Sequence, residues 1–524
     1  MNEGPLKGLL VLDLTRVLVG PYCTMVLSDL GARVIKVEAP EVGDDSRGFG
    51  PFVEDQSAYF MSLNRGKESI ALNLKNDEDK KIFEKILAKA DILVENFKPG
   101  TLEKWGYGYN DIKDKYPRLI YASASGFGQT GPMKELPAYD MVVQGMGGLM
   151  SVTGQPNSEP TRVGTSIGDI TAGLFTAIGI NAALFDREKT GKGSHIDVSM
   201  LDCQIAILEN AIARYLSKGE IPKPMGSRHP SIAPFEAFKT KDSYIIVAAG
   251  NDKLFEGMCL TLGCDCHKEE KFKDNKSRNQ NIDELKIIIE DKLKNKTTSE
   301  WVDIFTEKKI PCGPINNIKE AVENPQIQFR NMIVSAEHNK IGTFKMAGNP
   351  IKLSGYQDSI TRGEIPKPMG SRHPSIAPFE AFKTKDSYII VAAGNDKLFE
   401  GMCLTLGCDC HKEEKFKDNK SRNQNIDELK IIIEDKLKNK TTSEWVGIFT
   451  EKKIPCGPIN NIKEAVENPQ IQFRNMIVSA EHNKIGTFKM AGNPIKLSGY
   501  QDSITRGEIP DLDQHRKKIL EEFK

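Results

Sequence analysis

GLLVLDLTRVLVGPYCTMVLSDLGARVIKVEAP, residues 8–40, contains two aliphatic runs separated by a helical pattern. The first run, residues 8–15, has the length of one strand, and the second begins at residue 33. Pro21 suits the first turn of a helix between them, and Gly31 suits the position just after its end. Strand, helix and strand in this order predict a parallel sheet covered by helices.

The same alternation continues through the first half of the chain. DILVENF (91–97) and RLIYASAS (118–125) predict further buried strands, and residues 170–187 predict a helix followed by the strand SHIDVSM. Residues 200–216 then predict one long helix that is apolar on more than one face, which is typical of a buried helix. The N-terminal half is therefore expected to be one large α/β domain.

A smaller domain is expected after residue 219. A proline-rich linker leads into DSYIIVAAG, which predicts a strand, and then into a helical stretch from residue 253. Two more helical patterns and the strand-like IPCGP follow, and the charged span 268–276 predicts a solvated surface. This mixture predicts a second, smaller α/β domain.

That second domain is encoded twice. Residues 219–362 recur as residues 363–506 with one difference, Asp303 against Gly447, and one copy removed leaves 380 residues. A period of 144 is far longer than the roughly 20–50 residues of solenoid repeats. We expect four segments: a large domain (1–218), a first copy (219–362), a second copy (363–506) and a tail (507–524). We also expect one copy to be redundant and the first copy to occupy the large domain, because Gly447 weakens a helix by up to about 1 kcal/mol.

Composition narrows the class of function. Lys plus Arg and Asp plus Glu both number 72, so no net charge would attract nucleic acid or an anionic membrane. The ten cysteines form no disulfide-like framework, and no segment reaches the roughly 20 apolar residues of a membrane span. These features predict a soluble, cytoplasmic protein.

Two motifs are tested and set aside. GFGQTG (126–131) matches a dinucleotide fingerprint, but Pro132 and Pro137 interrupt the helix that such a site requires, so a glycine-rich loop is predicted. CDCH (264–267) supplies at most three ligands in one tight group, and no second pair of ligands accompanies it. No metal site is expected.

Asp169 has two interpretations. It stands in SIGDITAGLF, directly before an apolar helical pattern, where Asp most often caps a helix. It could also be a functional carboxylate at a helix start, with Gly168 and Ala172 leaving room for a ligand. Spacing alone favours the cap, and the two roles are compatible.

Six segments together resemble one known family. They are GPYCTMVLSDLGARVIKVEAPEVGDDSR, ADILVENFKPGTLEKWGY, GFGQTGP, AYDMVVQGMGG, GDITAG and PCGPINNI. In order and spacing they resemble the family III, or CaiB/BaiF, CoA-transferases, which include formyl-CoA and carnitine CoA-transferases. The resemblance covers the chain to Arg362 and the tail from Gly507. It implies a large Rossmann-like domain and a smaller α/β domain in subunits that interlock as a homodimer.

The resemblance also implies the site residues. Asp169 matches the family's nucleophile. Positions that match the family's CoA-binding segments are Leu18, Val19, Leu72, Asn73, Leu74, Lys75, Asn96, Phe97, Lys98, Lys104, Pro137, Ala138, Tyr139 and Asp140. The family's glycine loop over the active site matches Ala249, Gly250 and Asn251, and in the second copy Ala393, Gly394 and Asn395.

The sequence departs from formyl-CoA transferases at three places. Ala39 stands where those enzymes have an arginine beside the second strand, and Pro137 stands where they have a lysine. Their run of four glycines is reduced to AAGND at residues 248–252. These departures leave the acyl donor and the acceptor acid open.

The implied reaction moves CoA from an acyl-CoA to a carboxylic acid through an aspartyl-CoA thioester, with no cofactor beyond the CoA substrate itself. An acyl-CoA racemase of the same superfamily is an alternative, but it has a histidine where this chain has Tyr139. A tyrosine with a pKa near 10 is a poor base at neutral pH, which favours transfer. A CoA-binding protein without turnover is a further alternative.

Overall fold

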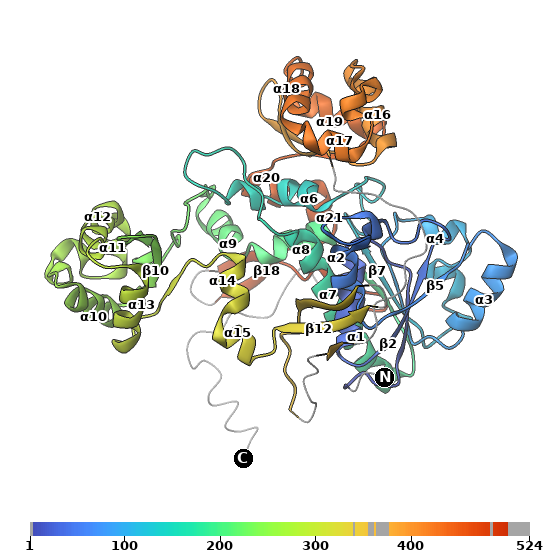
Figure 1. The fold of residues 1–524 in the computed structure, drawn as a ribbon, viewed down its shortest axis with the longest axis horizontal. Helices are drawn as coiled ribbons and strands as arrows, with labels where there is room; N and C mark the ends of the chain where they lie inside the picture. The colour runs from blue at the N-terminus through green and yellow to red at the C-terminus, as the bar shows by residue number, and fades with distance from the viewer. Residues whose placement is uncertain (1–3, 339–340, 355–360, 363–376, 483–485, 501–524) are drawn as a thin grey trace. The chain divides into compact units, whose positions relative to one another are not determined.

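The computed structural model describes residues 4–338, 341–354, 361–362, 377–482 and 486–500 (Figure 1). The chain divides into two compact units. One contains residues 1–152, 160–222 and 331–524, and the other contains residues 153–159 and 223–330. The C-terminal tail 507–524 lies outside the described residues.

A seven-stranded sheet forms the centre of the first unit. Six strands are parallel, and the seventh, at one edge, is antiparallel and comes from the second copy. In sheet order the strands are β20 (Ile495–Leu497), β8 (His195–Ser199), β7 (Ile120–Ser125), β6 (Ile92–Glu95), β1 (Leu10–Asp13), β2 (Arg33–Glu38) and β5 (Glu68–Ala71). The predicted parallel α/β sheet is confirmed.

Both faces of this sheet are buried. Successive side chains of a strand point to opposite faces, so Val11 joins one hydrophobic cluster and Leu12 joins another. Helices α1 (Val19–Asp29) and α7 (Ile167–Thr190) pack on each other at the first cluster, where a Cβ on Gly173 would lie 2.7 Å from a carbonyl of α1. The remaining short elements before α6 are α2 (Ala58–Asn64), α3 (Asp77–Leu87), α4 (Thr101–Lys104), α5 (Tyr109–Ile112), β3 (Phe52–Val53) and β4 (Gln56–Ser57).

The expectation of a single helix over residues 200–216 is wrong. Two helices occupy this stretch, α8 (Met200–Ile207) and α9 (Glu209–Lys218), because Leu208 leaves the helical conformation. The Ser199 side chain accepts a hydrogen bond from the Asp202 amide and fixes the start of α8. The expected burial of α8 is confirmed, while α9 packs its apolar side against the second copy.

Helix α7 has the length and composition of a membrane-crossing helix, and it is the one such helix among the described residues. The expectation that no segment reaches this threshold is therefore wrong. Half of its most apolar window is buried, and it packs against α1, β7 and β8. The core helix of a soluble protein meets the same criterion, so the finding gives weak support for a span.

The first copy folds into a small α/β domain. Three antiparallel strands, β9 (Phe235–Lys239), β10 (Tyr244–Ala248) and β11 (Cys312–Pro314), carry helices around their own core. The helices at this core are α10 (Asp252–Leu262), α11 (Asn275–Gln280), α12 (Ile282–Leu293) and α13 (Thr298–Glu307). Helices α14 (Ile318–Glu323) and α15 (Pro325–Phe329) follow β11 and have no buried residue. The predicted second α/β domain is confirmed as a fold.

The second copy repeats these elements. Its strands are β15 (Phe379–Lys383), β16 (Tyr388–Ala392) and β17 (Cys456–Pro458). Its helices are α16 (Asp396–Leu406), α17 (Asn419–Gln424), α18 (Ile426–Leu437), α19 (Thr442–Glu451), α20 (Ile462–Glu467) and α21 (Pro469–Phe473). Asp303 and Gly447 are both exposed on equivalent helices, so the one difference leaves the fold unchanged.

The second copy, rather than the first, packs on the large domain. Its Ile390, Ile462 and Val466 belong to the same buried cluster as α6 (Asp140–Met146) and α8. The expectation that the first copy takes this place is wrong. Both copies carry the same contact residues, and position 303/447 lies outside the contact, so the glycine penalty has no bearing on docking.

Each copy ends in a β-hairpin with a different neighbour. In the first copy, β12 (Ile333–His338) and β13 (Gly342–Ala347) pack on Phe60 and Met61 of α2, and β14 (Thr361–Arg362) pairs with β12. In the second copy, β18 (Ile477–His482) and β19 (Gly486–Ala491) lie on α9, and β20 follows. Ile351 and Leu353, the first copy's counterparts of β20 residues, are exposed and form no strand.

Candidate active site

Asp169 lies in the first turn of α7, three residues after the cap. The cap residue is Ser166, whose side chain makes no capping hydrogen bond. The interpretation of Asp169 as the N-cap is therefore wrong, because the helix begins at Ile167, earlier than the pattern indicates. Its carboxylate stands at the positive end of a 24-residue helix.

A second carboxylate lies beside it. Asp140, the first residue of α6, accepts a hydrogen bond from the Gly168 amide at 2.8 Å and another from Gln144 Nε2 at 2.8 Å. The Asp169 amide also donates to Asp140. A Cβ on Gly168 would lie 2.8 Å from Val143, so glycine before Asp169 permits this close approach of α6 and α7. Asp140 thus takes the capping role that the sequence suggested for Asp169.

Burial raises the pKa of Asp169 well above its usual value, and the Asp140 charge raises it further. Burial also raises the pKa of Asp140. The pKa values of Tyr59 and Tyr139 are raised by burial and, in part, by the Asp169 charge, which places both phenols within electrostatic reach of it. An ionised Asp169 is poorly solvated here, which is the condition of a reactive carboxylate nucleophile.

We expect Asp140→Asn to move the acid limb of any Asp169-dependent activity to lower pH. The Asp140 charge raises the Asp169 pKa, so its removal lowers that pKa and leaves more Asp169 ionised in acid. The pH profile of kcat/KM measures the shift, with the exposed Asp114→Asn as control. An acid limb that stays in place or moves upward contradicts this assignment.

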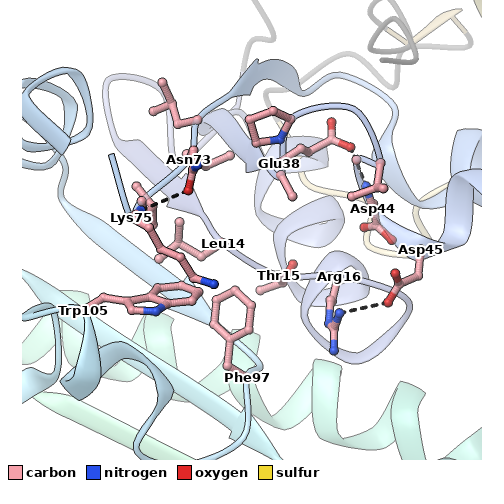
Figure 2. Close-up of a pocket in the computed structure, with 17 residues that line it drawn as sticks. Leu14, Thr15, Arg16, Glu38, Asp44, Asp45, Asn73, Lys75, Phe97 and Trp105 are labelled. Carbon is pink, nitrogen blue, oxygen red and sulfur yellow. Dashed lines mark hydrogen bonds and ion pairs between the residues drawn. The ribbon is translucent and has the colours of Figure 1, made fainter. Parts of the chain in front are cut away.

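A cavity of about 390 Å³ opens at the carboxyl ends of β1, β2 and β5, where ligands bind in parallel sheets. Figure 2 shows Lys75, Trp105 and Phe97 gathered on one side of it, and Arg16 paired with Asp45 on the other. The Phe97 and Trp105 rings meet edge to face, with centroids 5.5 Å apart. Aromatic faces and nearby cations are suited to a flat base and to phosphate groups.

Several predicted CoA-binding residues surround this cavity. Leu72, Asn73, Leu74, Lys75 and Phe97 line it. Asn96 lies behind the lining, where its side chain binds the Arg16 backbone through 2.9 and 2.8 Å hydrogen bonds. Lys98 forms an ion pair with Glu135 at 3.3 Å, and Lys104 is the exposed last residue of α4.

The other predicted residues lie nearer Asp169. Leu18 and Val19 are buried at the start of α1. Pro137, Ala138 and Tyr139 lead into α6, so they carry the chain to the Asp140 carboxylate beside Gly168. A Cβ on Gly126 would lie 2.1 Å from the Ala138 Cβ, so the glycine-rich loop supports this entry.

Sequence reasoning missed Arg16 and Trp105. Arg16 follows β1 directly, lines the cavity and pairs with Asp45 at 3.0 Å. Its place at the carboxyl end of a parallel strand was the available signal. Trp105 follows α4, and its position is evident only once the loop after β6 is folded.

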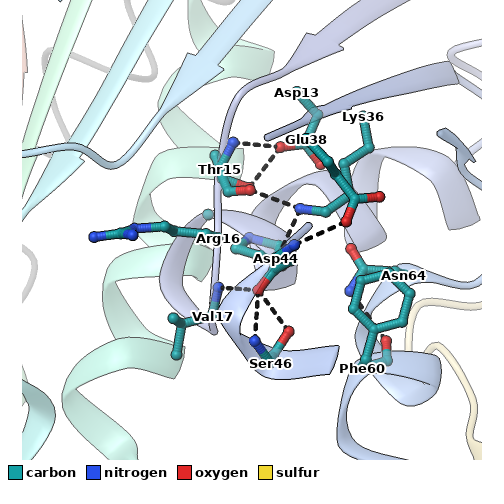
Figure 3. A network of polar contacts seen from close by, with 12 residues as sticks. Asp13, Thr15, Arg16, Val17, Lys36, Glu38, Asp44, Ser46, Phe60 and Asn64 are labelled. Atoms are coloured by element: carbon teal, nitrogen blue, oxygen red, sulfur yellow. Dashed lines mark hydrogen bonds and ion pairs between the residues drawn. The ribbon is translucent and has the colours of Figure 1, made fainter. Parts of the chain in front are cut away.

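A buried polar network fixes the loop that carries Arg16 (Figure 3). Asp13 accepts hydrogen bonds from Thr15 and lies 3.2 Å from Lys67 Nζ, while Lys36 Nζ binds the Thr15 carbonyl at 2.6 Å and Asp44 at 2.8 Å. Burial acts to raise the Asp13 pKa, but the lysines and hydroxyls outweigh it and hold the pKa at about 2. These contacts tie the loop that carries Arg16 to β1 and β2, and Asp13 is ionised at neutral pH.

The two candidate glycine loops lie in different units. Ala249, Gly250 and Asn251 belong to residues 223–330, where Asn251 caps α10 and the Gly250 carbonyl accepts from Arg278 at 3.0 Å. Ala393, Gly394 and Asn395 follow β16, and β16 packs on α6. The second set is therefore carried by the copy that covers the helix beginning at Asp140.

Comparison with known proteins gives a consistent result. A family model described as CoA-transferase family III matches residues 6–367 and, overlapping it, residues 355–516. The chain belongs to CoA-transferase family III. The second match of the family III model begins just before the second copy, as the duplicated sequence requires.

Relatives in this family share most of the chain. An acetyl-CoA:oxalate CoA-transferase of Acetobacter aceti is 47% identical over 367 residues, covering 70% of this chain and 93% of its own. A human succinyl-CoA:glutarate CoA-transferase is 40% identical over 397 residues, covering 75% and 90%. A CaiB/BaiF protein of Brucella suis, solved as a crystal structure, has a TM-score of 0.61 at 38% identity, covering 71% and 97%. Family III members thus resemble this chain with one copy removed.

Proposed function

We propose that this protein transfers CoA from an acyl-CoA to a carboxylic acid, with Asp169 as the nucleophile. The observation that carries the proposal is the half-buried Asp169, raised in pKa and held beside Asp140 at the start of α7. The cavity at the strand ends offers aromatic rings and cations for the nucleotide part of CoA.

The reaction would proceed through four covalent exchanges at Asp169. Its carboxylate attacks the thioester carbonyl, the C–S bond breaks, and CoA thiolate leaves behind a mixed anhydride. The thiolate then attacks the Asp169 carbonyl carbon, the anhydride C–O bond breaks, and the original acid departs as a carboxylate. The incoming acid repeats these steps in reverse, so the thioester bond is conserved without a redox or metal cofactor.

Oxyanion stabilisation would come from outside the α7 terminus. The Gly168 and Asp169 amides already donate to Asp140, so these two donors are occupied. The Ala393 amide donates to the Pro378 carbonyl at 3.0 Å and is occupied as well. We therefore assign this role to the backbone amides of Gly394 and Asn395, because β16 brings the second copy onto α6. Burial of Asp169 would also keep water from hydrolysing the anhydride.

A short dicarboxylic acid is the proposed acceptor. The two CoA-transferase relatives described above are named for oxalate and glutarate, and both of these acids carry two carboxylates. A panel of acyl-CoA donors against mono- and dicarboxylic acids, read by mass, tests this, and we expect new CoA thioesters with dicarboxylates. Exchange of an α-proton in deuterated water without transfer would indicate the racemase, and CoA binding alone would indicate a protein without turnover.

We further propose a homodimer in the cytoplasm with no cofactor beyond CoA. Leu174, Ile178 and Phe185 form an exposed apolar stripe on one side of α7, which a partner subunit would cover. All ten cysteines are unpaired, in keeping with a reducing compartment. Sedimentation equilibrium tests the dimer, and an active monomer contradicts it.

A further inference from the structure

The two copies present one surface in two states. We call this surface the docking face. In the second copy it comprises one side of strands β16 and β17, helices α20 and α21, and Arg474 after α21. In the first copy the same surface comprises strands β10 and β11, helices α14 and α15, and Arg330. In the second copy Ile390, Ile462 and Val466 are 0%, 0% and 4% exposed. Their first-copy counterparts Ile246, Ile318 and Val322 are 38%, 82% and 38% exposed. The same sequence is therefore covered once and uncovered once.

The large-domain surface that covers it is here called the socket. It consists of the glycine-rich loop 126–133, α6, the residues from β8 to α8, and α9. Arg474 of the second copy forms ion pairs with two carboxylates of the socket, Asp197 at 2.7 Å and Asp202. Arg474 is 4% exposed, whereas its counterpart Arg330 is exposed. Two socket carboxylates thus depend on a cation from the docking face.

Backbone amides and carbonyls of the socket also form hydrogen bonds with side chains of the docking face. Gln470 is fully buried, accepts from the Met133 amide at 2.9 Å and donates to the Phe127 carbonyl and, at 2.9 Å, to that of Thr130. Asn460 donates two 2.9 Å hydrogen bonds, from its amide to the Gly145 carbonyl and from Nδ2 to the Met146 carbonyl. The first copy's Gln326 is exposed.

Glycines shape the socket for these side chains. A Cβ on Gly128 would lie 2.2 Å from Arg474 Nη1, one on Gly131 would lie 2.4 Å from Gln470 Oε1, and one on Gly145 would lie 2.4 Å from Ile390 Cδ1. Gly128 and Gly131 also have positive φ, which other residues rarely adopt. The loop that sequence analysis left without a role is a receptor for the docking face.

Each chain carries two docking faces and one socket. We propose that the docking face of the first copy binds the socket of a second copy of this chain, in place of that chain's own second copy. The residues that make the contact are identical in both copies, because Asp303 and Gly447 lie outside it. The contacts formed between chains are therefore those already present within one chain.

The first copy's hairpin favours a second chain over its own. It is packed on α2, whereas the docked copy has its hairpin on α9. Occupying its own socket in the same way would require the first copy to release α2, while docking residues 223–330 on another chain leaves that hairpin in place. Because a tethered domain acts at roughly millimolar effective concentration, about 1% of sockets would be exchanged at about 10 µM chains.

A photo-crosslinker at Glu323 tests the proposal in the full-length chain. The equivalent Glu467 accepts a hydrogen bond from the Tyr215 hydroxyl at 3.1 Å, and both glutamates are exposed. We expect Glu323→p-benzoylphenylalanine to crosslink to α9 near Tyr215. In a mixture of ordinary and ¹⁵N-labelled chains, products joining the two isotopes show that the contact is between chains. The same probe at Glu467 is the control for docking within one chain.

Two matched variants decide the outcome. Arg330→Glu should remove the interchain product, because the buried socket carboxylates reject an acid, and Arg474→Glu should raise it at least about tenfold by vacating the socket. If Arg474→Glu does not fold, the wild-type yield must instead rise in proportion to protein concentration. Products confined to single chains, products unaffected by Arg330→Glu, or no product above background would each overturn the proposal. None of these readouts depends on transferase activity.

Discussion

Asp169→Ala is expected to lower the rate of CoA transfer by at least about a thousandfold, because the covalent intermediates form on this carboxylate. The fold should persist, because Ser166 rather than Asp169 occupies the cap position of α7. Within the described residues, the Asp169 side chain makes no hydrogen bond that holds another helix or strand in place. Acyl-CoA binding should also persist, because the cavity lies around Leu72–Lys75 and Phe97. Steady-state transfer and calorimetric CoA binding measure the two effects.

Glu188→Gln on the same helix is the matched control, because it removes an exposed carboxylate and should leave transfer unchanged. Hydroxylamine added to wild type with acyl-CoA should modify Asp169 and no other carboxylate, as peptide mass shows. Near-normal turnover by Asp169→Ala, or labelling at Asp140 instead, would remove the assignment of the nucleophile.

Arg474→Ala is expected to weaken the docking of the second copy by about 3–5 kcal/mol, because it leaves buried carboxylates without their cation. Burial raises the pKa of Asp202 to about 6 even with Arg474 beside it, so an unpaired Asp202 is costly at neutral pH. The site also loses the Arg474 contact with Asp197. Hydrogen exchange of the β20 and α21 amides measures the loss as a local opening free energy.

Arg330→Ala is the matched control within the same chain. It removes the same side chain from the same local sequence. Because Arg330 is exposed, the local opening free energy should change by no more than about 0.5 kcal/mol. Hydrogen exchange should be measured at about 1 µM protein, where docking between chains is minor. Equal effects of the two substitutions would mean that the buried contact of Arg474 contributes nothing.

The sequence predicted the large domain well because its strands are continuous aliphatic runs with helix signals between them. The site was harder to predict. Asp140 and Gly168 are 28 positions apart, and their hydrogen bond depends on how α6 and α7 pack. The start of α7 was placed too late because Ser166, whose side chain makes no capping bond, gives a weak signal. Spacing alone gave Asp169 the capping role that Asp140 fills in the structure, and the nucleophile role of Asp169 came from the family resemblance.

Which copy docks could not be read from the sequence, because the copies agree at every residue of the docking face. The glycine at position 447 drew attention to helix stability, yet both helices form. The buried ion pairs of Arg474 join residues 272 and 277 positions apart, and no local pattern encodes such pairs. Chain connections, rather than residue types, distinguish the two copies.

Because the edge strand β20 is synthesised last in the sheet, the order of synthesis affects how the large domain folds. Its partner β8 leaves the ribosome about 300 residues earlier. The first copy emerges 144 residues ahead of the second. At roughly 5–20 residues per second, it has the socket to itself for about 7–30 s. We therefore expect the newborn chain to seat its first copy and then to exchange it for the second, so that the finished molecule differs from the first folded form it passes through.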